Sequence, residues 1–212
     1  MGETQRIPRR PAILDYAQTE AIVGAQDVAD SSVLAHSTAW ALLGVGDEDF
    51  DAHALARLKE LVSTGGIPLV AELWASSPDF TLPGALWRGF FFREWYHRDP
   101  LIVAELYLLG LGAERVPGLE RPLNDAPLDE VITQADALLR GERTDDDLEE
   151  IFTAIARAMR IIAAGDPRVG QQWIDDPHDA LAYGVTMRAR ALVMTAQELE
   201  RASSRARVGD LD

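Results

Sequence analysis

Cysteine is absent from this chain of 212 residues. Its absence excludes a disulfide, a thiolate metal site and a cysteine nucleophile. Lysine occurs once, at Lys59, which leaves a single candidate for Schiff-base chemistry. We expect no bound cofactor, and the lack of cysteine is compatible with a reducing compartment.

Positive charge is also scarce. Twenty Lys and Arg residues stand against 35 Asp and Glu residues, and the formal net charge is -15 at pH 7. Because basic side chains that neutralise phosphates supply most non-specific affinity for nucleic acid, this balance opposes DNA and RNA binding. It equally opposes binding to anionic lipid surfaces. We expect neither nucleic acid nor a membrane as a partner.

No apolar run is long enough to cross a bilayer, which takes about 20 residues. The longest, Leu101 to Ala113, is interrupted by Glu105 and two glycines. The N-terminal stretch 1–16 carries charge without a continuous apolar segment, so we expect no signal peptide. These features predict a soluble cytoplasmic protein.

The short motifs of several enzyme classes are missing as well. The sequence has no phosphate-binding G-x-x-x-x-G-K-[ST] loop, no H-E-x-x-H zinc helix and no G-x-S-x-G nucleophile elbow. Catalysis is not excluded, because catalytic triads are recognised by geometry and not by their order in the chain. Nothing in the sequence argues for an enzyme, however, and no resemblance to a known family emerges.

Helix signals occupy nearly the whole chain, whereas the alternating pattern of β-strands is almost absent. In the clearest helix, Thr144 and Asp147 form a predicted capping box, and an apolar stripe from Leu148 to Ile162 precedes a stop at Gly165. First-turn prolines mark several other helix starts. The expected helices cover residues 11–25, 30–43, 48–63, 67–76, 82–97, 99–110, 127–140, 144–165, 168–173 and 176–203.

We therefore expect an all-α fold, a single compact multi-helix bundle of about eight or nine helices. Residues 11–203 form this domain, with a flexible N-terminal arm at 1–10 and a flexible C-terminal tail at 204–212. The segment 114–127, rich in Pro and charge, is interpreted as a long surface loop. The helices beyond it are too few to bury their apolar stripes alone.

The most aromatic stretch holds six rings between Trp87 and Tyr96. At about 100° per residue, Trp87, Phe91 and Trp95 share one face of a helix. Because a helix that is apolar most of the way round is usually buried, we expect 82–97 to be the central helix of the fold.

Glu94 and His97 lie among these rings, and two interpretations stay open. In the structural one, Glu94 pairs with Arg98 one turn on, or with an arginine from another helix, and the helix C-terminus stabilises His97. In the functional one, a carboxylate with a raised pKa lies in a dry aromatic pocket and binds a ligand. The candidate ligand-binding residues are Trp87, Phe91, Glu94, Trp95 and His97. The Glu-x-x-His spacing occurs once, whereas helical di-metal sites use it twice, so no metal site is predicted.

An acidic segment, residues 142–150, contrasts with a basic C-terminal helix. The arginines of that helix are Arg188, Arg190, Arg201, Arg205 and Arg207. This contrast favours pairing inside the molecule or across a dimer, with a solvated face as the alternative. We expect a homo-oligomer that joins these two surfaces. The leading interpretation is a non-catalytic, self-associating interaction or scaffold protein. The alternative is a small-ligand-binding protein, or an enzyme, that uses an aromatic pocket around Glu94 and His97.

Overall fold

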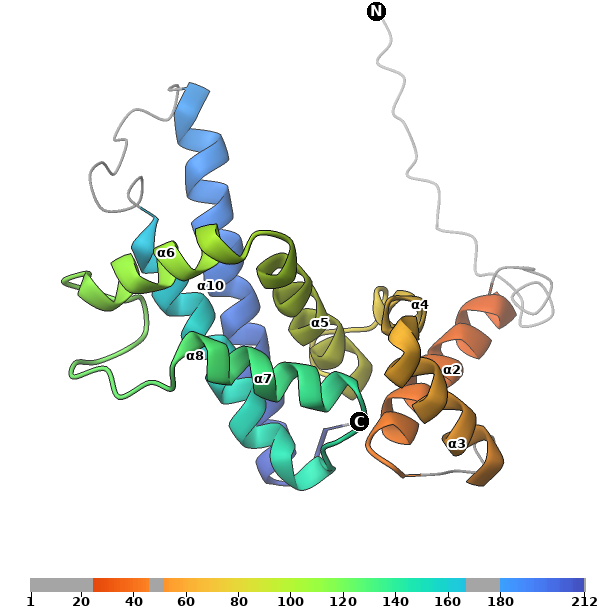
Figure 1. The fold of residues 1–212 in the computed structure, drawn as a ribbon. Helices are drawn as coiled ribbons and strands as arrows, with labels where there is room; N and C mark the ends of the chain where they lie inside the picture. The colour runs from red at the N-terminus through yellow and green to blue at the C-terminus, as the bar shows by residue number, and fades with distance from the viewer. Residues whose placement is uncertain (1–24, 46–51, 167–179, 212) are drawn as a thin grey trace, which may run out of the picture.

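The computed structural model describes residues 25–45, 52–166 and 180–211. These residues are mainly α-helical and contain no β-strand, which confirms the all-α prediction. The helices are α2 (Ala25–Leu42), α3 (Ala52–Leu61), α4 (Ile67–Trp74), α5 (Leu82–Arg98), α6 (Pro100–Gly112), α7 (Leu128–Leu139), α8 (Leu148–Gly165) and α10 (Ala180–Arg207). Figure 1 shows α5 between the N-terminal helices and the group formed by α6, α7, α8 and α10.

The expected number of helices, eight or nine, is slightly higher than the number that the structure describes. Counted as continuous helical runs, the described residues form seven. One reason is that η1 (Val62–Gly66), a π-helical turn, joins α3 to α4 in a single run that is kinked at Gly65, where φ is 93°. The expected helix at 168–173, nearly all of the one at 11–25 and the expected arm at 1–10 lie outside the described residues.

Helix α8 forms much of the core, as its apolar stripe predicts. The 3-10 turn η2 (Asp145–Asp147) precedes it, and the capping box is present, with the Thr144 backbone N–H donating to Asp147 Oδ2 at 2.9 Å. The predicted stripe from Leu148 to Ile162 is buried. It packs against α10, α6, α7 and α5.

Helix α5 begins where its sequence predicts. The Thr81 side chain accepts a hydrogen bond from the Gly84 N–H at 3.3 Å, and Pro83 occupies the first turn. The helix packs against α2 and α4 on one side and against α6, α7, α8 and α10 on the other. It is not buried all round, however, because Phe91 is exposed and only one face of the second half is covered.

Helices α6 and α8 cross with their backbones in contact. A Cβ added at Gly110 would lie 1.8 Å from the Ile161 carbonyl oxygen, and one added at Gly165 would lie 1.7 Å from the Leu106 carbonyl oxygen. Val103, Tyr107 and Gly110 form the buried side of α6. The two glycines therefore fix α6 on α8 and decide which of its sides turns outward.

The C-terminal helix is longer than expected. α10 runs to Arg207, into the segment 204–212 for which a tail was predicted, and Leu211 beyond it is buried. Among the described residues, no helix combines the length and hydropathy needed to cross a bilayer.

Candidate functional site

The outward side of α6 carries large apolar side chains that nothing in the described chain covers. Leu101, Ile102, Leu108 and Leu109 are 85%, 56%, 68% and 49% exposed. We call these four residues the α6 stripe. Ile102, Leu108 and Leu109 follow Leu101 by one, seven and eight residues. This spacing places all four on one side of a helix, with Glu105 between them. Contiguous exposed apolar side chains of this kind mark interaction surfaces.

A cavity of about 550 Å³ lies beside the α6 stripe, between α5, α6, α8 and α10. Its lining includes two of the predicted site residues, Phe91 and Trp95, and one residue of the stripe, Ile102. Met159 and Ile162 of α8 and Leu192 of α10 contribute further apolar surface. The stripe and the cavity are thus continuous at Ile102.

Trp87, the third aromatic residue predicted for the site, is partly buried against the core. Its ring stacks on Phe90 at a centroid distance of 5.7 Å and lies tilted to Phe91 at 6.4 Å. It does not line the cavity with Phe91 and Trp95. Its ring contacts are therefore packing contacts within α5 and against the core.

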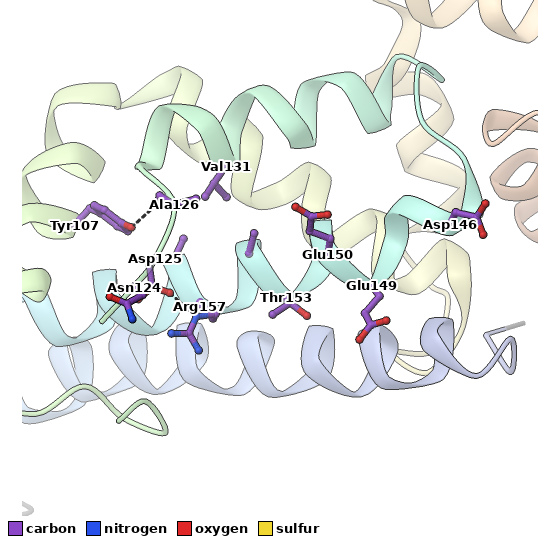
Figure 2. A pocket seen from close by; sticks show the side chains of 12 residues that line it. Tyr107, Asn124, Asp125, Ala126, Val131, Asp146, Glu149, Glu150, Thr153 and Arg157 are labelled. Atoms are coloured by element: carbon purple, nitrogen blue, oxygen red, sulfur yellow. Dashed lines mark hydrogen bonds and ion pairs between the residues drawn. The ribbon is translucent and has the colours of Figure 1, made fainter. Parts of the chain in front are cut away.

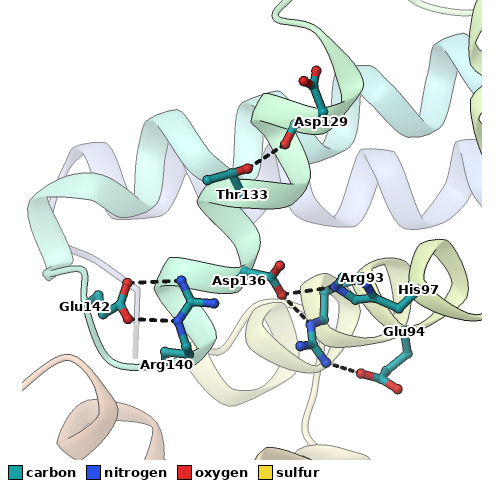
Figure 3. Close-up of polar contacts among 8 residues, drawn as sticks. All are labelled: Arg93, Glu94, His97, Asp129, Thr133, Asp136, Arg140 and Glu142. Carbon is teal, nitrogen blue, oxygen red and sulfur yellow. Dashed lines mark hydrogen bonds and ion pairs between the residues drawn. The ribbon is translucent and has the colours of Figure 1, made fainter. Parts of the chain in front are cut away.

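Glu94 and His97 lie on another side of α5, which faces α7 (Figure 3). Arg93 holds this side together, with Nη1 donating to Glu94 Oε1 and Nε donating to Asp136 Oδ1 at 2.6 Å. His97 Nε2 lies 3.2 Å from the same Asp136 oxygen. The side chains of Glu94 and His97 are each 41% exposed, and neither lines the aromatic cavity. The structure therefore separates the five predicted site residues into a cavity pair, Phe91 and Trp95, a polar pair, Glu94 and His97, and the packed Trp87.

The ion-pair partner expected for Glu94 has to be corrected. Its partner is the adjacent Arg93 instead of Arg98 or an arginine from another helix. Arg98 instead bonds Asp99, from Nε to Oδ2 at 2.9 Å. No local pattern predicts the role of Asp136, which accepts the hydrogen bond from Arg93 Nε while Arg93 Nη1 lies beside Glu94.

Asp136 is the electrostatic centre of this α5–α7 contact. Burial alone would raise the pKa of its carboxyl group, but the hydrogen bonds and charges of Arg93 and His97 outweigh burial and lower that pKa below 3.8. One turn further along α7, Arg140 pairs with Glu142 at the surface (Figure 3). Arg93, His97 and Asp136 thus form a polar contact between α5 and α7.

Arginines of the C-terminal helix find partners inside the same chain. Arg207 Nη1 lies 3.7 Å from Glu149 Oε1 in the acidic segment, and Arg201 Nη2 lies 2.5 Å from Asp79 Oδ2. Arg205 lies 3.9 Å from Asp210. Pairing inside the molecule, which the sequence left open, is therefore present, while the side chain of Arg188 lies outside the described part.

The described residues contain no group of three His, Asp or Glu side chains arranged to hold a metal ion. Comparison of the chain with protein families, with curated proteins and with solved structures finds no match. The candidate site therefore rests on the geometry of the α6 stripe and of the cavity beside it. Sequence reasoning missed the stripe, although one signal was available, since α6 has Glu105 as its only charged residue.

Proposed function

We propose that the protein is a non-catalytic helical interaction protein that self-associates through the α6 stripe. The observation that carries the proposal is the exposure of four large apolar side chains on one side of a helix whose other side is fixed to the core. Burying them against a partner would remove apolar surface from water, at about 25 cal/mol per Å².

A second copy of the chain is the proposed partner because the α6 stripe is self-complementary. In an antiparallel pair of α6 helices about a two-fold axis at Glu105, Leu101 would face Leu109 of the second copy, and Ile102 would face its Leu108. A two-fold interface uses the same surface on both subunits, as this arrangement does. The two Glu105 side chains would meet at the axis and repel each other, so we expect a weak dimer.

The acidic segment 142–150 and the basic C-terminal helix offer a second surface for the same self-association. Attraction between chains through this surface is weaker where the arginines already pair with carboxylates of their own chain, as Arg201 and Arg207 do. Opposite charges at a protein surface are screened by salt, whereas burial of apolar surface is not weakened by it. The two surfaces therefore make opposite predictions about salt.

Sedimentation velocity over a range of protein and salt concentrations tests this proposal. A dimer that forms with increasing protein concentration and persists at high salt supports the α6 stripe. A dimer that dissociates with salt would assign self-association to the charged surfaces instead. A monomer at every concentration would contradict self-association.

Binding of a small apolar ligand in the cavity of Phe91 and Trp95 is a second candidate function. Its support is the cavity itself, because ligand sites are concave and mostly apolar. A hydrophobic fluorescent dye that binds wild-type protein and loses affinity in Phe91→Ala, with a change in Trp95 emission, would favour this function. Equal dye binding by both proteins would count against it.

The net negative charge also limits the classes of partner that the protein can bind. With a net charge of -15, we expect no binding to duplex DNA at physiological salt. A cytoplasmic location remains part of the proposal and is supported by the absence of cysteine.

A further inference from the structure

The α6 stripe and the aromatic cavity share one stretch of exposed apolar surface. Ile102 belongs to both, and Phe91 on α5, which lines the cavity, is 61% exposed. Ala191 on α10 also lines the cavity and is exposed. The cavity therefore opens to solvent beside the stripe, and its rim extends the apolar surface from α6 onto α5 and α10.

The α6 stripe alone is small for a protein interface. Its four exposed fractions together amount to the area of less than three fully exposed residues. Each side of a standard interface, in contrast, contributes about 800 Å² from roughly 20 to 30 residues. A second copy that binds the stripe must therefore cover further surface, and the rim of the aromatic cavity is the apolar surface that continues the stripe at Ile102.

A second copy seated on the stripe and on this rim would cover the mouth of the cavity. Because the core of an interface packs as closely as a protein interior, a hollow of about 550 Å³ left empty there would forfeit many contacts. The floor of the cavity, with Met159, Ile162 and Leu192, suits an apolar side chain. In the antiparallel pair of α6 helices, Leu108 of the second copy faces Ile102 and is the side chain placed to enter.

A second hollow, of about 460 Å³, lies along α8 and is less suited to an apolar group (Figure 2). Its charged lining residues are Asp125, Asp146, Glu149, Glu150 and Arg157. An apolar side chain placed among these carboxylates would remove them from water, which is costly. In the aromatic cavity the charged lining residues are Arg98, Asp99 and Asp166, and the first two pair with each other at 2.9 Å.

We propose that the aromatic cavity receives Leu108 of the second copy, and that a small uncharged apolar molecule bound there competes with self-association. This inference rests on the proposed self-association through the α6 stripe. Both occupants need the same space between Phe91, Trp95 and Leu192. By thermodynamic linkage, the molecule weakens the dimer by the same factor by which the dimer weakens binding of the molecule. Ligand binding and self-association are then alternative states of one surface.

Sedimentation velocity of the full chain with and without N-phenyl-1-naphthylamine, an uncharged apolar dye, tests the competition. Saturating dye should raise the dissociation constant of the dimer by about tenfold or more, as is typical for coupled sites. In a fluorescence titration, the affinity for the dye should fall by the same factor at protein concentrations where the dimer is complete.

A matched pair of variants tests the same contact without the dye. Ala191→Glu places a carboxylate at the cavity, and Gln197→Glu places one at an exposed position of the same helix outside the cavity. Ala191→Glu should weaken both the dimer and dye binding by about tenfold, because either occupant would remove the new charge from water. Gln197→Glu should leave both unchanged. Both variants should fold, since glutamate favours helix.

Four results would overturn the inference. They are failure of the dye to bind, dye binding that leaves the dimer unchanged or strengthens it, equally stable dimers in Ala191→Glu and Gln197→Glu, and a monomer at every concentration. The last result would also overturn the proposed function. A dimer that is lost in Leu101→Asp but unchanged in Ala191→Glu would overturn this inference alone and leave self-association through the α6 stripe in place.

Discussion

Arg160 and Glu200 form a two-pronged ion pair that joins α8 to α10. Arg160 Nε donates to Glu200 Oε1 at 2.6 Å, and Nη2 donates to Oε2 at 2.7 Å. The remaining Nη1 donates to the Pro117 carbonyl oxygen at 2.8 Å. Arg160 itself is buried, so this one side chain joins two long helices and a loop at the edge of the core.

Replacing Glu200 should therefore be costly. We expect Glu200→Gln to lower the free energy of unfolding by about 1 to 3 kcal/mol, because it leaves a buried guanidinium without its counter-charge. Partial exposure of Glu200 keeps the loss below the largest values known for buried pairs. Urea denaturation measures it, with Asp210→Asn as the control, since Asp210 is exposed and lies 3.9 Å from Arg205. Equal losses in the two variants would contradict this role of the Arg160 pair.

The crossing of α6 and α8 gives a second prediction. Gly110→Ala should lower the free energy of unfolding by about 3 kcal/mol or more, because its Cβ would overlap the Ile161 carbonyl group. Gly112 lies in the same helix with nothing within 4 Å of an added Cβ. Gly112→Ala should leave stability unchanged or slightly higher, since alanine favours helix. Similar urea midpoints for the two variants would show that the backbones do not touch.

Asp136 makes stability depend on pH in a defined direction. Its pKa is lower in the folded chain than the ordinary 3.8, so its contribution is complete above that value and is lost as pH falls through the folded pKa. Asp136→Asn should cost about 1 to 2 kcal/mol at pH 7. The difference between wild type and variant should shrink below about pH 4. A difference that stays constant down to pH 2 would exclude the proposed link to ionisation.

Glu94 should matter little for stability. The Glu94 side chain in its pair with Arg93 is 41% exposed, and pairs that reach solvent contribute at most about 1 kcal/mol. Glu94→Gln should therefore change the free energy of unfolding by no more than that. A buried pair, as the sequence suggested, would lose about 2 to 5 kcal/mol in the same denaturation experiment. A loss of that size would mean that Glu94 is covered in solution.

Local chemistry made the helix starts predictable. The capping box of Thr144 and Asp147 and the first-turn prolines Pro83 and Pro100 act within a few residues, and α8, α5 and α6 begin where they indicate. The buried stripe of α8 was predictable because its polar and apolar sides differ clearly.

The functional surfaces were harder to predict from sequence. α5 and α6 are apolar on most sides, so periodicity alone does not tell which side faces the core. The partners of Arg93 and Arg157 lie 43 and 32 residues away in the chain, at Asp136 and Asp125, and nothing local announces them. The glycine contacts that orient α6 likewise depend on a helix about 50 residues further on, whose position only the fold supplies.

A matched pair of variants tests whether the outward side of α6 is an interface. Leu101 and Leu69 each follow a first-turn proline, and they are 85% and 63% exposed. Sedimentation velocity should show that Leu101→Asp abolishes the dimer while Leu69→Asp leaves it intact, with both variants folded by circular dichroism. A dimer that survives Leu101→Asp, or that is lost equally in Leu69→Asp, would mean that the α6 stripe is not the dimer interface.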